Sequence, residues 1–159
     1  MNQQSRRAIT AADLRVWRDF IETSESLRSR LDSRLQNDSS LSAGDYGVLL
    51  ALSEADERSM RSSDLADAVG WERSRLSHHL RRMEARELIE RNPCADDTRG
   101  SRISLTESGS SAFRRGSVPH LRAIQELFLD ALSSEQLAHV DSITASLRHH
   151  LGLPERTPA

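Results

Sequence analysis

The chain has 159 residues, of which 36% are hydrophobic and 29% charged, a composition typical of a folded globular protein rather than a disordered one. Its formal net charge of −2 gives no overall sign of a nucleic-acid partner, so any such signal must come from local clusters. The single cysteine excludes an internal disulfide, and no apolar run reaches the roughly 20 residues that span a bilayer. We therefore expect a cytoplasmic protein with no membrane partner.

Two helices are predicted in the N-terminal third of the chain. Thr10 and Asp13 form a capping signal for a helix over residues 10–36, and Ser39 and Ser40 break it. Apolar residues recur along this helix every three or four positions, at Leu14, Trp17, Phe20, Ile21, Leu27, Leu31 and Leu35. A second capping signal at residues 42–45 opens a more apolar helix, which we expect at the centre of the fold.

The middle of the chain predicts two short helices followed by a hairpin. Ser62 or Ser63 caps the first helix and Gly70 ends it, and the second helix covers residues 73–86. Residues 88–92 and 101–105 alternate apolar and polar side chains, as short strands do. Residues 97–100 then fall at the tip of the hairpin.

Two longer helices are predicted in the C-terminal third. Thr106 caps a helix that runs to Phe128, and Pro119 is expected to bend it. Ser133 and Gln136 form a capping box for the last helix, whose apolar stripe is Leu137, Val140, Ile143, Leu147 and Leu151. The stripes on the first and last helices need a partner surface, and pairing with a second copy of the chain is the commonest solution. Residues 152–159 are expected to form a loose tail.

The order helix, turn, helix and hairpin is that of a winged helix-turn-helix, and the second of these helices has two contrasting faces. Leu76, Leu80 and Met83 fall on the side expected to face the core. Four arginines and no acid lie between residues 73 and 82, and the opposite side gathers Ser74, Arg75, His78, Arg81 and Arg82. Such a face predicts contact with the phosphates and base edges of double-stranded DNA. The alternative is an ordinary solvated helix face.

The hairpin carries an arginine and an aspartate that suit the same partner. Arg99, at the predicted tip, can enter the minor groove, where the electrostatic potential is strongly negative. Asp97 can hold that guanidinium through a charge-assisted hydrogen bond. The alternative is a surface ion pair worth about 0–1 kcal/mol.

These residues resemble a pattern of the MarR family of bacterial transcriptional regulators, which reads Asp-x-Arg, five residues, and then Leu-Thr-x-x-Gly. The pattern stands here as Asp97, Arg99, Leu105, Thr106 and Gly109. The resemblance implies a single, mainly α-helical domain over residues 1–159 with a small β-hairpin wing. Its winged helix-turn-helix lobe is expected over residues 42–105, and its helical dimerisation region over residues 10–36 and 106–151.

The resemblance also implies how such a protein binds DNA. A homodimer with interlocked first and last helices would bind a palindromic operator, with half-sites roughly 10 bp apart, and repression is the usual outcome. The implied DNA-reading positions are Ser74, Arg75, Ser77 and His78, with Arg99 at the wing tip. Three residues depart from the family pattern. Glu72 stands where Ser or Thr often caps the reading helix, Trp71 replaces a smaller apolar residue, and Glu87 replaces a usual Gly, so Glu87 either adopts a left-handed conformation or reshapes the turn.

A small-molecule effector is a further implication, because family members often respond to phenolic or aromatic acids bound between the dimer helices and the DNA-binding lobe. The candidate lining residues are Trp17, Phe20, Tyr46 and His120, with Arg15 as the partner of a carboxylate. The helical spacing of the aromatic residues is equally that of ordinary core positions. An oxidant switch through Cys94, whose pKa nearby arginines can lower, is an alternative trigger.

No motif predicts an enzyme, a metal site or a cofactor. The chain lacks a Gly-rich phosphate loop, a nucleophile motif and a Cys/His cluster with metal-ligand spacing. Winged helices also bind proteins, so a protein-interaction module without specific DNA readout is the alternative function.

Overall fold

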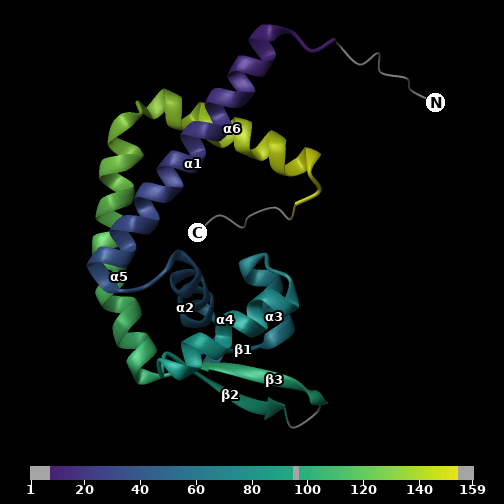
Figure 1. Ribbon diagram of the computed structural model, residues 1–159, viewed down its shortest axis with the longest axis vertical. Helices are drawn as coiled ribbons and strands as arrows, with labels where there is room; N and C mark the ends of the chain where they lie inside the picture. The colour runs from purple at the N-terminus through teal and green to yellow at the C-terminus, as the bar shows by residue number, and fades with distance from the viewer. Residues whose placement is uncertain (1–7, 95–96, 154–159) are drawn as a thin grey trace, which may run out of the picture. The chain divides into compact units, whose positions relative to one another are not determined.

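The computed structural model describes residues 8–94 and 97–153, and at Cys94 and residues 97–100 it describes the backbone alone. Two compact units divide the chain, Met1–His120 and Leu121–Ala159. The fold is mainly helical with one small sheet, as predicted. Figure 1 labels its principal helices and strands, which are α1 (Ala11–Ser39), α2 (Ala43–Glu54), β1 (Ser59–Arg61), α3 (Ser62–Val69), α4 (Arg73–Ala85), β2 (Ile89–Cys94), β3 (Asp97–Leu105), α5 (Glu107–Leu127) and α6 (Ser134–His150).

The first two helices begin at the capping boxes that the sequence predicted. The Thr10 hydroxyl accepts the backbone N–H of Asp13, whose carboxylate accepts the backbone N–H of Thr10. Ser42 and Asp45 repeat this arrangement at the start of α2. Between the two helices, Ser40 ends α1 in the left-handed region with φ 58°. The predicted break at Ser39 and Ser40 is confirmed, and the helix runs three residues beyond the expected residue 36.

The core of the first unit is built around α2, which the sequence placed at the centre. Val48, Leu49 and Leu52 are fully buried there. They belong to a cluster to which α3, α4 and the sheet contribute Leu65, Leu76, Leu80, Met83, Ile89 and Ile103. Burying each of these side chains stabilises the fold by about 1.5–3 kcal/mol. This cluster fixes α4 and the hairpin as one piece.

The sheet has three strands in the order β1, β3, β2, all antiparallel, where the sequence predicted two (Figure 1). The missed strand, β1, pairs Ser59 with Ser104 and Arg61 with Arg102. Because β1 leads directly into α3, Arg61 becomes the N-terminal cap residue and makes no side-chain capping bond, so the predicted serine cap is wrong. Gly70 ends α3 in the left-handed region, as predicted.

The hairpin is longer than the alternating apolar pattern indicated. Backbone pairing continues to Cys94 opposite Asp97, with a register irregularity after Pro93. The backbone of residues 97–100 therefore belongs to β3 rather than to the turn in which the sequence analysis placed it. Ladder hydrogen bonds do not require an apolar face, which is why the side-chain pattern underestimates the strands.

The last two helices also begin where the sequence indicated. The Thr106 hydroxyl accepts the backbone N–H of Gly109 at the start of α5, which continues through Pro119 and ends at Leu127, one residue before the predicted end. Ser133 and Gln136 form the capping box of α6. Among the described residues, none of the helices combines the length and hydrophobicity of a membrane span.

Candidate nucleic-acid interface

Helix α4 has the two faces that its sequence predicted. Leu76, Leu80 and Met83 are fully buried. On the other side, Ser74, Arg75, His78, Arg81 and Arg82 are exposed, and Ser77 is half-buried. The α4 surface formed by these six residues carries three guanidinium groups and no carboxylate. A basic helix face with hydroxyl groups is suited to phosphates and base edges.

Trp71, just before α4, orients one of these arginines. The guanidinium carbon of Arg75 lies 4.4 Å from the centre of the Trp71 ring, a cation–π arrangement. The indole also contacts His79, whose ring lies edge-on to it with 5.0 Å between the ring centroids. Glu72 is the N-terminal cap residue of α4 and makes no side-chain capping bond, so this departure from the family pattern leaves the cap weaker.

A buried network joins α2 to α4. Asp45 is 3% exposed, and its carboxylate accepts a hydrogen bond of 2.7 Å from Arg86 Nη1. His79 Nε2 lies 3.0 Å from the second carboxylate oxygen of Asp45. On the other side of the imidazole, Arg82 Nη2 lies 2.9 Å from His79 Nδ1. Arg86 also donates to the backbone carbonyl of Ser40, so the network reaches the end of α1.

The pKa values of this network follow from burial and from the neighbouring charges. Burial raises the pKa of Asp45, but the hydrogen bond from Arg86 and the backbone N–H of Ser42 outweigh it, so the pKa lies below the ordinary 3.8. Burial lowers the pKa of His79 below 6.5, and the attraction of Asp45 opposes this shift without cancelling it. Asp45 is therefore ionised and His79 neutral near pH 7. Sequence analysis missed both, since Asp45 was recognised only as a capping residue.

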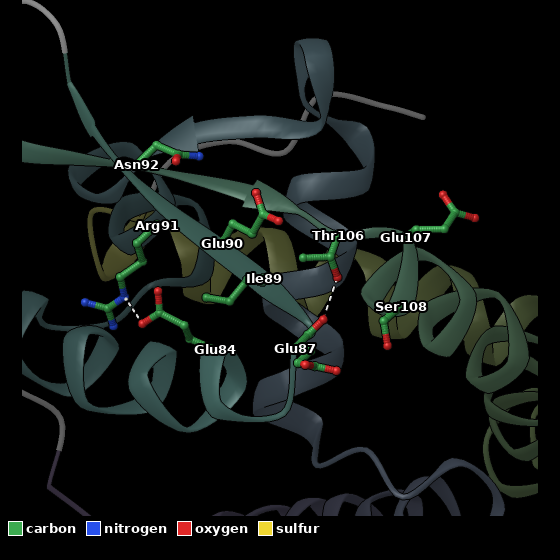
Figure 2. Close-up of a pocket in the computed structure, with 9 residues that line it drawn as sticks. All are labelled: Glu84, Glu87, Ile89, Glu90, Arg91, Asn92, Thr106, Glu107 and Ser108. Atoms are coloured by element: carbon green, nitrogen blue, oxygen red, sulfur yellow. Dashed lines mark hydrogen bonds and ion pairs between the residues drawn. The ribbon is translucent and has the colours of Figure 1, made fainter.

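Arg91 fastens the hairpin to α4. Its Nη2 donates to the carbonyl of Ser77, and its Nε lies 3.4 Å from the Glu84 carboxylate, as the dashed line in Figure 2 shows. Arg91 thus joins the hairpin to both Ser77 and Glu84 of α4. The side chains of Asp97 and Arg99, proposed for the minor groove, and of Cys94 lie outside the described residues.

The turn after α4 explains the Leu-Thr-x-x-Gly pattern physically. Glu87 adopts the left-handed conformation, with φ 58°, which is the first of the two outcomes its replacement of Gly allowed. The Thr106 hydroxyl donates to the Glu87 carbonyl, a bond drawn in Figure 2, while accepting from Gly109. A Cβ at Gly109 would lie 1.9 Å from the Leu88 carbonyl oxygen. Only glycine allows α5 to begin this close to the turn.

The hollow in Figure 2 has the opposite electrostatic character from α4. Four carboxylates line it, from Glu84, Glu87, Glu90 and Glu107, together with the single cation of Arg91. Like charges in this hollow disfavour phosphate groups and aromatic acids. This hollow is therefore a poor site for DNA phosphates and for acidic ligands, unlike the basic α4 surface.

The structure separates the five residues considered for an effector. Tyr46 and His120 lie together, with 4.6 Å between ring centroids, and the Phe113 ring also lies near Tyr46, at 5.2 Å between centroids. Burial lowers the pKa of His120, with Asp32 opposing, and its Nδ1 has no hydrogen-bond partner among the described residues. The other three candidates, Arg15, Trp17 and Phe20, are exposed on α1.

Comparisons with known proteins all find transcriptional regulators among the most similar matches. A family model described as transcriptional regulator SarA/Rot matches residues 30–115. AbsC, a MarR family transcriptional regulator from Streptomyces coelicolor, is 35% identical over 91% of this chain and 97% of its own, with a TM-score of 0.84. Sco3205, a MarR family regulator from the same organism solved in complex with DNA, is 33% identical over 94% of this chain and 93% of its own, with a TM-score of 0.87.

A more distant structure shares the fold. It is an organohalide-sensing transcriptional regulator in its 2,4-dichlorophenol-bound form, 18% identical over 94% of this chain and 89% of its own, with a TM-score of 0.77. The matched proteins are transcriptional regulators rather than enzymes. Within the described residues, no cluster of three or more His, Cys, Asp or Glu side chains is placed to hold a metal ion.

Proposed function

The chain belongs to the MarR family of transcriptional regulators and is a DNA-binding regulator, and we propose that it acts in the cytoplasm as a repressor that binds a palindromic operator as a homodimer. The observation that carries this proposal is the α4 surface, where exposed arginines stand opposite three fully buried apolar side chains. That contrast fixes the basic side outward and leaves it free to enter a major groove.

The residues proposed to contact DNA divide between α4 and the wing. On α4 they are Ser74, Arg75, Ser77, His78, Arg81 and Arg82, all exposed or half-buried. In the wing, Arg99 is proposed to enter the minor groove with Asp97 holding its guanidinium. The winged lobe over residues 42–105 supplies both parts, and Arg91 couples them through Ser77 and Glu84.

A homodimer is proposed from the apolar side chains that the chain leaves exposed. On α1 these are Leu14, Trp17 and Phe20, and on α6 they are Val140, Ile143 and Leu147. Exposed apolar residues in such numbers on terminal helices mark an interaction surface. Pairing of residues 10–36 and 106–151 with the same segments of a second copy covers them and presents two α4 helices to two operator half-sites.

The proposed effector is a small aromatic or phenolic compound that releases the operator. Tyr46, Phe113 and His120 form an aromatic cluster, and the buried Nδ1 of His120 has no hydrogen-bond partner among the residues that the structure describes. Phe20 lines a separate hollow along α1 that also contains Arg28, a better placed cation than Arg15. The dichlorophenol-bound regulator of the same fold supports this class of ligand.

Selection of bound sequences from a random DNA pool tests the DNA-binding proposal. We expect a palindromic site whose affinity falls steeply with salt, with a slope of about −0.9 per phosphate contact. Arg75→Ala and Arg81→Ala should each weaken binding by about 1–3 kcal/mol, whereas Arg30→Ala, which removes an exposed arginine from α1, should not. Unchanged affinity in both α4 variants would reject α4 as the reading helix.

Titration of phenols and aromatic acids against the protein–operator complex tests the effector. A ligand that releases wild-type protein should release His120→Ala and Tyr46→Phe less effectively, because both variants alter the aromatic cluster. Equal release from all three proteins would place the effector elsewhere, and no release by any compound would reject this ligand class.

A further inference from the structure

Trp71 stands between the core and the DNA-reading side of α4. Its backbone N–H donates to the carbonyl of Ala66, which fixes the residue just after the end of α3. On the core side, the indole packs so closely on α2 that a Cβ at Gly44 would lie 2.8 Å from the Trp71 ring and 3.0 Å from His79. On the outer side, the ring carries the Arg75 guanidinium. The indole therefore contacts both α2 and an exposed arginine, so the position of α2 can affect the direction of the Arg75 side chain.

His79 holds a second arginine in a defined direction. A guanidinium only donates hydrogen bonds, so His79 Nδ1, 2.9 Å from Arg82 Nη2, must be the accepting nitrogen. The ring proton then sits on Nε2, which lies 3.0 Å from the carboxylate of Asp45, close enough for electrostatic attraction although the contact lacks hydrogen-bond geometry. This arrangement exists only while the imidazole is neutral, and Asp45 selects the tautomer that leaves Nδ1 free to accept.

We propose that Trp71 and His79 are positioning residues that hold Arg75 and Arg82 in their DNA-binding directions before the operator arrives. This inference rests on the proposed function of α4. An exposed arginine has many accessible rotamers, and part of this side-chain entropy is lost when it contacts DNA. Stacking on an indole face leaves the edge N–H donors of Arg75 free for phosphate or guanine, so the entropy is lost on folding rather than on binding.

The double-mutant cycle of Trp71→Leu and Arg75→Ala tests the first link through operator affinity. Trp71→Leu should weaken binding about three-fold per protomer, and about ten-fold for a dimer on two half-sites, as expected from loss of an exposed cation–π contact. In the Arg75→Ala background the same change should have no further effect, and Trp71→Phe should recover part of the loss. Equal weakening by Trp71→Leu in both backgrounds would show a merely structural role and overturn the proposal.

A pair of glycine variants tests the link without removing any of the named side chains. Gly44 and Gly47 lie one turn apart on α2, and a Cβ at Gly47 would meet nothing within 4 Å. Both changes to alanine favour the helix. Gly44→Ala should nevertheless weaken operator binding, because it displaces Trp71 and His79, whereas Gly47→Ala should leave it unchanged. Equal affinities in these two variants would contradict the proposed transmission from α2.

The His79 link has a spectroscopic readout that needs no DNA. The chain has two tryptophans, so in a Trp17→Phe background the emission comes from Trp71. The groups facing His79 are Asp45 of α2, Arg82 of α4, and Arg86, the C-terminal cap residue that follows α4. Acidification should change the Trp71 emission with a midpoint below 6.5, and His79→Gln should abolish that transition. Operator affinity should fall over the same pH range in wild-type protein and not in His79→Gln.

The outcomes separate failure of this inference from failure of the proposed function. If Arg75→Ala leaves operator affinity unchanged, α4 is not the reading helix and both ideas fall. If Arg75→Ala weakens binding while Trp71→Leu and Gly44→Ala do not, the DNA-reading assignment stands and the positioning role is wrong. Circular dichroism of each variant checks that it is folded. If Trp71→Leu does not fold, Trp71→Phe and Gly44→Ala supply the test.

Discussion

The winged lobe and the two terminal helices use their apolar side chains in opposite ways. In the lobe, Leu49 and Leu76 are fully buried, whereas Trp17 on α1 is 61% exposed and Ile143 on α6 is 55% exposed. Burial of such a side chain stabilises a protein by about 1.5–3 kcal/mol, so the lobe gains this stabilisation within one chain at positions where the terminal helices do not. The contrast supports the proposal that a second copy covers the terminal helices.

The two regions also differ in the sequence distance of their polar contacts. In the lobe, Arg86 bonds Asp45 across 41 positions, and Ser59 contacts Ser104 across 45. The side-chain hydrogen bonds described for α6 and its capping box, in contrast, join residues three or four positions apart. Contacts between distant residues thus hold together the lobe proposed to read DNA, while the hydrogen bonds described for the helix proposed to pair are local.

Truncation of a buried lobe side chain should have the largest effect on stability. Leu80 is fully buried, so Leu80→Ala should lower the free energy of unfolding by about 3–4 kcal/mol through lost burial and the cavity left behind. Urea denaturation at several protein concentrations measures this loss, which should not depend on concentration. Leu147→Ala on α6, 44% exposed in one chain, is the matched control, and its loss should shrink as the protein is diluted.

A charge placed in the exposed stripe of α6 should act on assembly rather than on the lobe. Ile143→Glu should weaken a homodimer about 100-fold, because an unpaired carboxylate would be buried in the interface. Light scattering over a range of concentrations measures the shift to monomer. Asp141→Asn changes a charge on the same helix without adding one to the stripe and serves as the control. A variant that remained as dimeric as the wild type would remove this stripe from the interface.

Local signals explain which parts of the fold were predictable. The capping box of Ser42 and Asp45 uses residues three apart, and the two faces of α4 follow from helical periodicity, so both were predicted. Strand β1 was missed because its three residues, with Met60 as the one apolar side chain, carry no pattern of their own. Its pairing with β3 also displaced the expected serine cap of α3 to Arg61.

The candidate site, like the fold, was predictable only where its features depend on residues close together in the sequence. Periodicity predicted which side of α4 faces outward, and this is confirmed by the exposure of Arg75 and Arg82. It did not predict that Arg75 stacks on Trp71 or that Arg82 contacts His79, because these directions depend on Asp45 and Gly44 of a different helix. The role of individual wing side chains stays a prediction.

Acidification should destabilise the first unit through two imidazoles, the buried His79 and the half-buried His120. The pKa values of His79 and His120 lie below 6.5 in the folded chain, so below pH 6.5 the unfolded chain takes up more protons. The free energy of unfolding should therefore be constant above pH 6.5 and fall as the pH drops from 6.5 through the folded-state values. The loss from Asp45 begins only below its ordinary pKa of 3.8.

Urea denaturation between pH 7.5 and 5 measures this dependence. His79→Gln should reduce the slope of unfolding free energy against pH, because one of the two imidazoles with a lowered pKa is gone. His78→Gln, which changes the exposed neighbour on α4 and keeps both of these imidazoles, is the matched control. A wild-type protein that became more stable on acidification would show that these imidazoles are protonated in the folded state.

The smallest expected effect on stability comes from a substitution in the turn between α4 and the hairpin. Glu87 has a positive φ of 58°, a conformation that costs an L-residue about 1–2 kcal/mol. Glycine avoids this cost, but its greater conformational entropy in the unfolded chain offsets part of the gain. Glu87→Gly should therefore raise the free energy of unfolding by about 0.5–1 kcal/mol in a denaturant titration. Glu87→Ala removes the same carboxylate from the acidic hollow but keeps the Cβ, so it should not reproduce the gain. Equal stabilisation by both changes would show that the energetic penalty at this turn comes from repulsion of the Glu87 carboxylate by Glu84, Glu90 and Glu107, and not from the backbone conformation. The stability of the lobe at this turn would then be limited by charge repulsion rather than by backbone geometry.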